Sequence, residues 1–134
     1  MRLFPLKIVT ADAVMFDGMA QSLTVRTTTG DMGILAGHAN TVAALGMGRC
    51  TVDMDGERKI AACIGGMVSV MDGRVTLVPT TFEWAEQIDI ARAERSETRA
   101  QSVLRSTNAS KADITLAEAR LKRALVRKYV ASVK

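Results

Sequence analysis

The chain has 134 residues, of which 48% are apolar and 24% charged, and its formal net charge is +4. This is enough for one globular domain or two small ones, and it excludes a disordered tail. No apolar run approaches the roughly 18 residues that span a bilayer, and the first residues lack a signal-peptide pattern, so we expect a cytosolic protein. All ten glycines lie between Gly18 and Gly73, and the prolines are Pro5 and Pro79. The last 55 residues therefore contain neither of the strong helix breakers.

Short β-strands are predicted along the first part of the chain. Asp-Gly pairs at 17–18, 55–56 and 72–73 are typical of tight antiparallel hairpins, because a type I′ turn needs positive φ at both central residues. Turn signals at this spacing favour a β-sandwich or barrel. The Gly65-Gly66 pair predicts a bulge or a close backbone approach. The predicted strands flank these pairs, at residues 14–16, 23–26, 50–54, 58–64, 67–71 and 74–78.

The second part is predicted to be an antiparallel pair of helices. Residues 83–106 are rich in Ala, Glu and Arg, and residues 107–110 are the expected turn. Ser110 followed three residues later by Asp113 predicts the cap of a second helix. A turn of about four residues makes the helices antiparallel, and alanine-rich faces let them approach closely. Three acidic residues complement the dipole at the expected start of the first helix: Glu83, Glu86 and Asp89.

Charge divides at nearly the same place as glycine content. Residues 1–84 have a net charge of −1 and residues 85–134 a net charge of +5. We therefore predict two domains, a β-sandwich at 1–84 and a helical hairpin at 85–134. The spacing of three arginines places a basic stripe on the second helix, and two lysines are expected to widen it. A solvated face, nucleic acid, anionic lipid and an acidic protein all fit this stripe: Arg120, Arg123, Arg127, Lys122 and Lys128.

Few residues suggest catalysis. His38 is the only histidine and has no titratable neighbour in sequence, so a loop residue is favoured over a general base or metal ligand. The glycines of residues 30–37 lack a P-loop lysine, which leaves a surface loop or a partner contact. Cys50 and Cys63 lack C-x-x-C spacing and are predicted to be buried thiols. Seven methionines are predicted as core filler rather than an adaptable surface: Met15, Met19, Met32, Met47, Met54, Met67 and Met71.

Four segments carry a resemblance to a known family. They are Phe16-Asp17-Gly18, the sequence GDMGILAGHA at 30–39, Gly65-Gly66 and the sequence IDIARA at 88–93. Their order and spacing resemble the epsilon subunit of bacterial F-type ATP synthases over the whole chain. The resemblance implies an N-terminal antiparallel β-sandwich of about ten strands and a C-terminal antiparallel two-helix hairpin. It also implies a non-catalytic subunit of the central stalk, which couples the rotor to ATP synthesis and whose hairpin inhibits ATP hydrolysis.

The resemblance further implies partners and contact residues. The partners would be the gamma subunit, the c subunits of the membrane ring and the catalytic alpha and beta subunits, at the cytoplasmic face of the bacterial cell membrane and without membrane insertion. The ring-facing residues would be Gly30, Asp31, Gly33 and His38. The residues facing a catalytic subunit would be Arg120, Lys122, Arg123 and Arg127.

No cofactor or metal is required in this family, but some members bind ATP as a regulatory ligand on the folded hairpin. Guanidinium groups suit the phosphates because they make charge-assisted, often bidentate contacts. The resemblance carries the ATP site onto Glu83, Ile88, Asp89, Arg92, Ala93, Arg99, Arg123 and Arg127.

Ala36 and Asn40 stand where the family usually has prolines, which predicts a less rigid ring-facing loop. Two other classes of function stay open. The first is a free-standing β-sandwich module whose basic hairpin binds nucleic acid, which predicts salt-sensitive retention of nucleic acid. The second is an enzyme that uses His38 or a cysteine, which predicts loss of activity in His38→Ala. The sequence leaves open the coupling ion, the resting state of the hairpin and the affinity for ATP.

Overall fold

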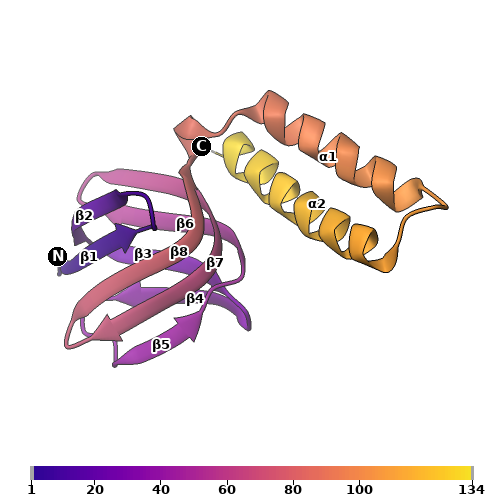
Figure 1. The fold of residues 1–134 in the computed structure, drawn as a ribbon. Helices are drawn as coiled ribbons and strands as arrows, with labels where there is room; N and C mark the ends of the chain where they lie inside the picture. Colours follow the sequence, from indigo (N-terminus) through magenta and orange to yellow (C-terminus); the bar gives the residue numbers. More distant parts are fainter. Residues whose placement is uncertain (1, 134) are drawn as a thin grey trace. The chain divides into compact units, whose positions relative to one another are not determined.

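The computed structural model describes residues 2–133, and the chain divides into two compact units, Met1–Trp84 and Ala85–Lys134 (Figure 1). No helix within residues 2–133 is both long and apolar enough to cross a bilayer. The second unit contains the 3-10 turn η1 (Ala85–Gln87) and the helices α1 (Ile90–Arg105) and α2 (Lys111–Ser132). The first unit contains β1 (Phe4–Val9), β2 (Val14–Ala20), β3 (Ser22–Thr27), β4 (Gly30–Leu35), β5 (Thr41–Ala44), β6 (Met47–Met54), β7 (Glu57–Met71) and β8 (Arg74–Trp84).

The strands of the first unit form one continuous sheet that curls around a single core. Its order is β2-β1-β8-β7-β6-β3-β4, with β5 paired to β7. Alternate side chains point inward, and Leu6, Ile8, Leu23 and Leu77 are fully buried. The predicted β-sandwich followed by two helices is confirmed. The sheet is mixed rather than purely antiparallel, because β1 and β8 run parallel.

Two long strands bend where the glycine pair lies. Gly65 and Gly66 have φ of +69° and +97°, and a β-carbon on Gly66 would lie 2.6 Å from the Cα of Pro79. The predicted close backbone approach is therefore confirmed. The pairing of β7 with β8 skips one residue on each strand at this point. Because β7 and β8 each continue through this irregularity, the described residues form eight strands where about ten were expected.

The three Asp-Gly pairs adopt different structures. Asp72 and Gly73 have φ of +50° and +80°, which confirms the predicted hairpin conformation between β7 and β8. Gly56 also has positive φ, but Asp55 does not. The predicted turn at 17–18 is wrong, because these two residues pair with β1 inside β2. The chain reverses earlier, between β1 and β2, where the Thr10 hydroxyl accepts hydrogen bonds from the backbone N–H groups of Asp12 and Ala13.

The first helix begins later than predicted. Glu83 and Trp84 still belong to β8, and α1 starts at Ile90. The physical reason is a buried aromatic pair: the rings of Phe82 and Trp84 meet edge to face with centroids 4.8 Å apart, and both side chains pack in the core. This packing holds the strand conformation to its last residue. Asp89 caps α1 instead, and its side chain accepts a hydrogen bond from the backbone N–H of Arg92.

The second helix begins as predicted. The Ser110 hydroxyl accepts from the Asp113 N–H at 3.1 Å, and the Asp113 carboxylate accepts from the Ser110 N–H at 3.3 Å. This reciprocal pair is a complete capping box. It fixes the start of α2 and the length of the turn that precedes it.

Sulfur-containing residues divide between the core and the surface. Cys50 and Cys63 are buried free thiols, as predicted. Burial raises the pKa of the Cys63 thiol to about 12, and burial together with the neighbouring Cys63 raises the pKa of Cys50. The prediction that the methionines are core filler is wrong for Met19, Met67 and Met71, each of which is at least half exposed. Three others pack against the core as expected: Met15, Met32 and Met54.

Candidate functional site

The first unit carries an exposed apolar surface on the outer face of β5, β7 and β8. Met67 lies between its partners Ala44 on β5 and Val78 on β8, so these three side chains are direct neighbours on one face. The next residue along β7, Val68, is buried and points inward. Because side chains alternate along a strand, Met67 points outward. The surface is called the outer apolar patch below, and it comprises Val42, Ala44, Met67, Met71 and Val78. A contiguous apolar patch of this kind is typical of a protein contact surface.

The residues expected to face the membrane ring do not form a single loop. Gly30, Asp31 and Gly33 lie on β4, whereas His38 follows the end of that strand. The rise of an extended strand separates the two ends of β4 by about 17 Å. The expectation of one surface loop over residues 30–37 is therefore wrong. The alternation that buries Ile34 and the pairing with β3 make this glycine-rich segment a strand.

Polar contacts tie β4, and the segment between β4 and β5, to neighbouring elements. Asp31 accepts a hydrogen bond at 2.7 Å from Arg26, which lies opposite it on β3, in an exposed ion pair. Beyond the other end, the Asn40 side chain accepts a hydrogen bond at 2.8 Å from the backbone N–H of Asp72. Asn40 thus links the segment between β4 and β5 to the hairpin turn between β7 and β8. Sequence reasoning missed this contact, because the two residues are 32 positions apart.

Three residues of the IDIARA segment have a visible structural role in the second unit. Ile88 is buried, Asp89 caps α1, and Ala93 is buried. Arg92 of the segment and Arg99 of its continuation are both exposed on α1. These arginines are seven residues apart, so they lie on the same side of the helix, two turns from each other.

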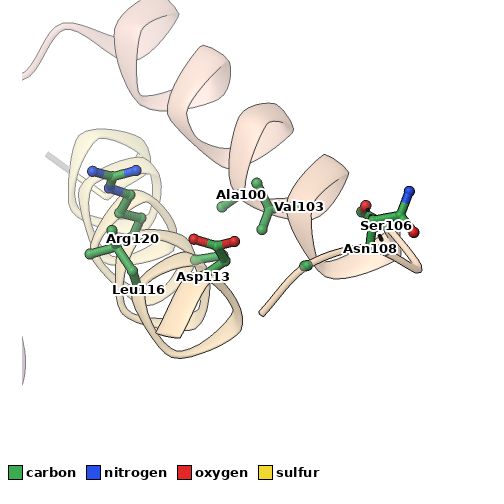
Figure 2. Close-up of a pocket in the computed structure, with 9 residues that line it drawn as sticks. Ala100, Val103, Ser106, Asn108, Asp113, Leu116 and Arg120 are labelled. Carbon is green, nitrogen blue, oxygen red and sulfur yellow. Dashed lines mark hydrogen bonds between the residues drawn. The ribbon is translucent and has the colours of Figure 1, made fainter. Parts of the chain in front are cut away.

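A cavity of about 400 Å³ lies between the helices at the turn end of the hairpin (Figure 2). Ala100 and Val103 contribute from α1, and Leu116 and Arg120 contribute from α2. The Asp113 carboxylate of the capping box also lines it. The cavity therefore combines an apolar lining with one guanidinium and one carboxylate group.

Helical spacing, counted from the residues that line this cavity, places the arginines of the two helices on one flank of the hairpin. Val103 follows Arg99 by four residues and so continues the same side of α1, and it lines the cavity together with Arg120. Arg120 begins the α2 stripe whose members are three and four residues apart. Among the described residues, the flank called the arginine flank below comprises Arg92, Arg99, Arg120, Arg123 and Arg127.

The two lysines expected to widen the α2 stripe lie elsewhere. Lys122 is two residues from Arg120, which corresponds to about 200° around the helix. Lys128 forms an ion pair with Glu97 of α1, at 3.0 Å and 3.1 Å from its two carboxylate oxygens. Glu83, which the resemblance places in an ATP site, lies on β8 of the first unit.

Comparison with known proteins covers both units. Residues 3–85 match the family described as the ATP synthase delta/epsilon chain, β-sandwich domain, and residues 86–131 match its long α-helix domain. The chain belongs to the ATP synthase delta/epsilon family. The expected resemblance to bacterial epsilon subunits is thereby confirmed.

Relatives in this family align with the chain from end to end. The ATP synthase epsilon chain of Ruminococcus albus is 40% identical and covers 100% of both chains. The epsilon chain of Bacillus licheniformis is 37% identical, over 98% of this chain and 99% of its own length.

Solved structures share the fold at lower sequence identity. A chain of the Euglena gracilis mitochondrial ATP synthase, from a structure of OSCP, F1 and the c-ring, has a TM-score of 0.84 at 24% identity, covering 98% of this chain and 82% of that chain. A chain from the central stalk and c-ring of the Tetrahymena thermophila mitochondrial ATP synthase has a TM-score of 0.67 at 16% identity, covering 95% of each. At these identities the likeness establishes the fold alone.

Proposed function

We propose that this chain is the non-catalytic epsilon subunit of the central stalk in a bacterial F-type ATP synthase. The observation that carries the proposal is the end-to-end match of both domains, with 40% identity to an epsilon chain over 100% of both sequences. In this role the chain couples the rotor to ATP synthesis through protein contacts. It works at the cytoplasmic face of the cell membrane as a peripheral subunit.

The first unit supplies the contacts with the rotor. The outer apolar patch offers a surface for the gamma subunit, since exposed methionine and valine side chains gain stability when a partner covers them. Residues of β4 and its following turn face the c subunits of the membrane ring. The candidate ring contacts are Gly30, Asp31, Gly33 and His38.

The second unit is the regulatory element. In its extended state α2 presents basic side chains to an acidic surface of a catalytic subunit and so inhibits ATP hydrolysis. Its candidate contacts are Arg120, Arg123 and Arg127 of the stripe, together with Lys122 on the opposite side of α2.

ATP acts as a regulatory ligand of the folded hairpin. The arginine flank takes Arg92 and Arg99 from α1, and Arg123 and Arg127 from α2. A triphosphate bound there would therefore hold the two helices together. ATP favours the folded form only as far as it binds that form more tightly than the extended one. The candidate residues on the second unit are Ile88, Asp89, Arg92, Ala93, Arg99, Arg123 and Arg127.

The decisive experiment measures ATP hydrolysis by the reconstituted complex. The complex is assembled with the full chain or with a chain that lacks residues 88–134, and the rate is followed across ATP concentrations. We expect the truncated chain to assemble and the rate to rise, most strongly at low ATP. An unchanged rate would show that the hairpin does not inhibit, and failure of the full chain to assemble with gamma would contradict the stalk assignment.

A further inference from the structure

The interface between α1 and α2 is built from small side chains. The buried residues along it recur every seven positions on each helix, which places them on one side of each helix. Methyl groups bury little apolar area, so this interface gains little from the hydrophobic effect. The larger residues beside it, Leu104 and Leu121, are partly buried. The buried alanines are Ala93 and Ala100 on α1 and Ala117, Ala124 and Ala131 on α2.

An ion pair crosses this weakly held interface. The Lys128 ammonium group contacts both carboxylate oxygens of Glu97, and the side chains retain 35% and 17% of their exposure respectively. Glu97 is two residues from Arg99, so the pair lies on the opposite side of the alanine interface from the arginine flank. Solvent and salt screen such a partly buried pair less than a fully exposed one.

We infer that the Glu97–Lys128 pair is a latch, which holds the two helices of the hairpin together. The alanine interface buries little apolar area, so an ion pair that crosses it supplies a large share of what keeps the two helices together. Partial separation of the helices would leave each of these partly buried charges without its partner. Opening the hairpin returns both charges to water and frees Lys128 to meet an acidic surface. The inference rests on the proposed movement of the hairpin.

The latch makes a prediction that two independently contributing charges do not. Removing one charge leaves the other half-buried in the closed hairpin, whereas removing both leaves an apolar pair that the interface can accommodate. Loss of one charge should therefore open the hairpin more than loss of both. Two charges that contribute independently would instead give additive effects.

Amide hydrogen exchange of α2 in the full 134-residue chain tests this prediction. The variants are Glu97→Leu, Lys128→Met and the double variant, with Glu94→Leu as the control at an exposed position on the same helix. We expect exchange to rise about tenfold in each single variant and to return to within about threefold of the parent in the double variant. Unchanged exchange in the strands of the first unit verifies that each variant has folded.

Two results would overturn the latch: single variants that exchange like Glu94→Leu, or a double variant whose effect is the sum of the singles. The charge-exchanged variant Glu97→Lys with Lys128→Glu gives a second check, since it should protect α2 better than either reversal alone. The exchange measurement does not depend on inhibition. If the single variants open the hairpin and ATP hydrolysis by the complex stays unchanged, the inhibitory function fails and the latch stands.

Discussion

Gly66 occupies a position where the space and the backbone both exclude a side chain. Its φ is +97°, and a β-carbon there would lie closer to the Val78 carbonyl oxygen than to any other neighbouring atom. Gly73 is a matched contrast, because its φ is +80° but no atom lies within 4 Å of an added β-carbon. The two positions therefore separate backbone strain from steric overlap.

We expect Gly66→Ala to lower the free energy of unfolding by about 3 kcal/mol or more, and Gly73→Ala by only about 1 kcal/mol. The first substitution must displace the backbone of β8, whereas the second only strains a hairpin turn. Urea denaturation of the two variants, followed by the fluorescence of Trp84, measures the difference. Equal losses of stability would contradict the overlap at Gly66.

At the scale of the strand and the helix, exposed apolar side chains distinguish two parts of the sandwich. Met67 and Met19 are equally exposed, but only Met67 belongs to the outer apolar patch. We expect Met67→Asp to weaken binding of the gamma subunit at least tenfold, because a carboxylate would lose its hydration when the partner covers the patch. Met19→Asp is the control that should bind normally. Co-purification and titration with isolated gamma check both variants, and equal binding would place the contact elsewhere.

The arginine flank gives a second prediction at this scale. At millimolar ATP we expect slower amide exchange in α2 of the isolated chain, because the triphosphate would join the two helices. Arg92→Ala and Arg99→Ala should each remove most of this protection. Arg105→Ala serves as the control, since Arg105 lies in the last turn of α1 and outside the flank. An ATP effect that survives both substitutions would exclude this flank as the site.

Local signals in the sequence predicted the elements that local interactions decide. Asp72-Gly73 forms its hairpin turn and Ser110 caps α2 because the residues that make each structure are four or fewer positions apart. Asp17-Gly18 carries the same turn signal, but pairing with β1 extends it into a strand. The predicted start of the first helix was wrong for a related reason, since the burial of Phe82 and Trp84 outweighs local helix propensity.

In the candidate site too, local spacing predicted some placements and missed those that depend on distant residues. Helical spacing was enough to group Arg120, Arg123 and Arg127 on one side of α2. It misplaced Lys128, because the Glu97 carboxylate that binds Lys128 lies 31 positions away on the other helix. Asn40 and Asp72 were missed for the same physical reason: the contact forms only after distant strands come together.

For the whole molecule, the boundary between the units coincides with the boundaries of composition and charge. The division falls after Trp84, where glycine-rich strands give way to helices and the net charge changes from −1 to +5. Each unit forms its own backbone hydrogen bonds, through the sheet in the first unit and through capped helices in the second. The proposed role, with one anchored part and one movable part, requires this organisation.

The position of Trp84 gives the protein a built-in optical separation of its two units. It is the only tryptophan of the chain and the last residue of the first unit, and its ring contacts both the Phe82 ring and the Lys59 ammonium group. Tryptophan emission therefore reports on the sandwich. Far-ultraviolet circular dichroism at roughly 222 nm is dominated by helical residues, which the second unit supplies. A single unlabelled sample can thus show whether the two units melt together or one after the other.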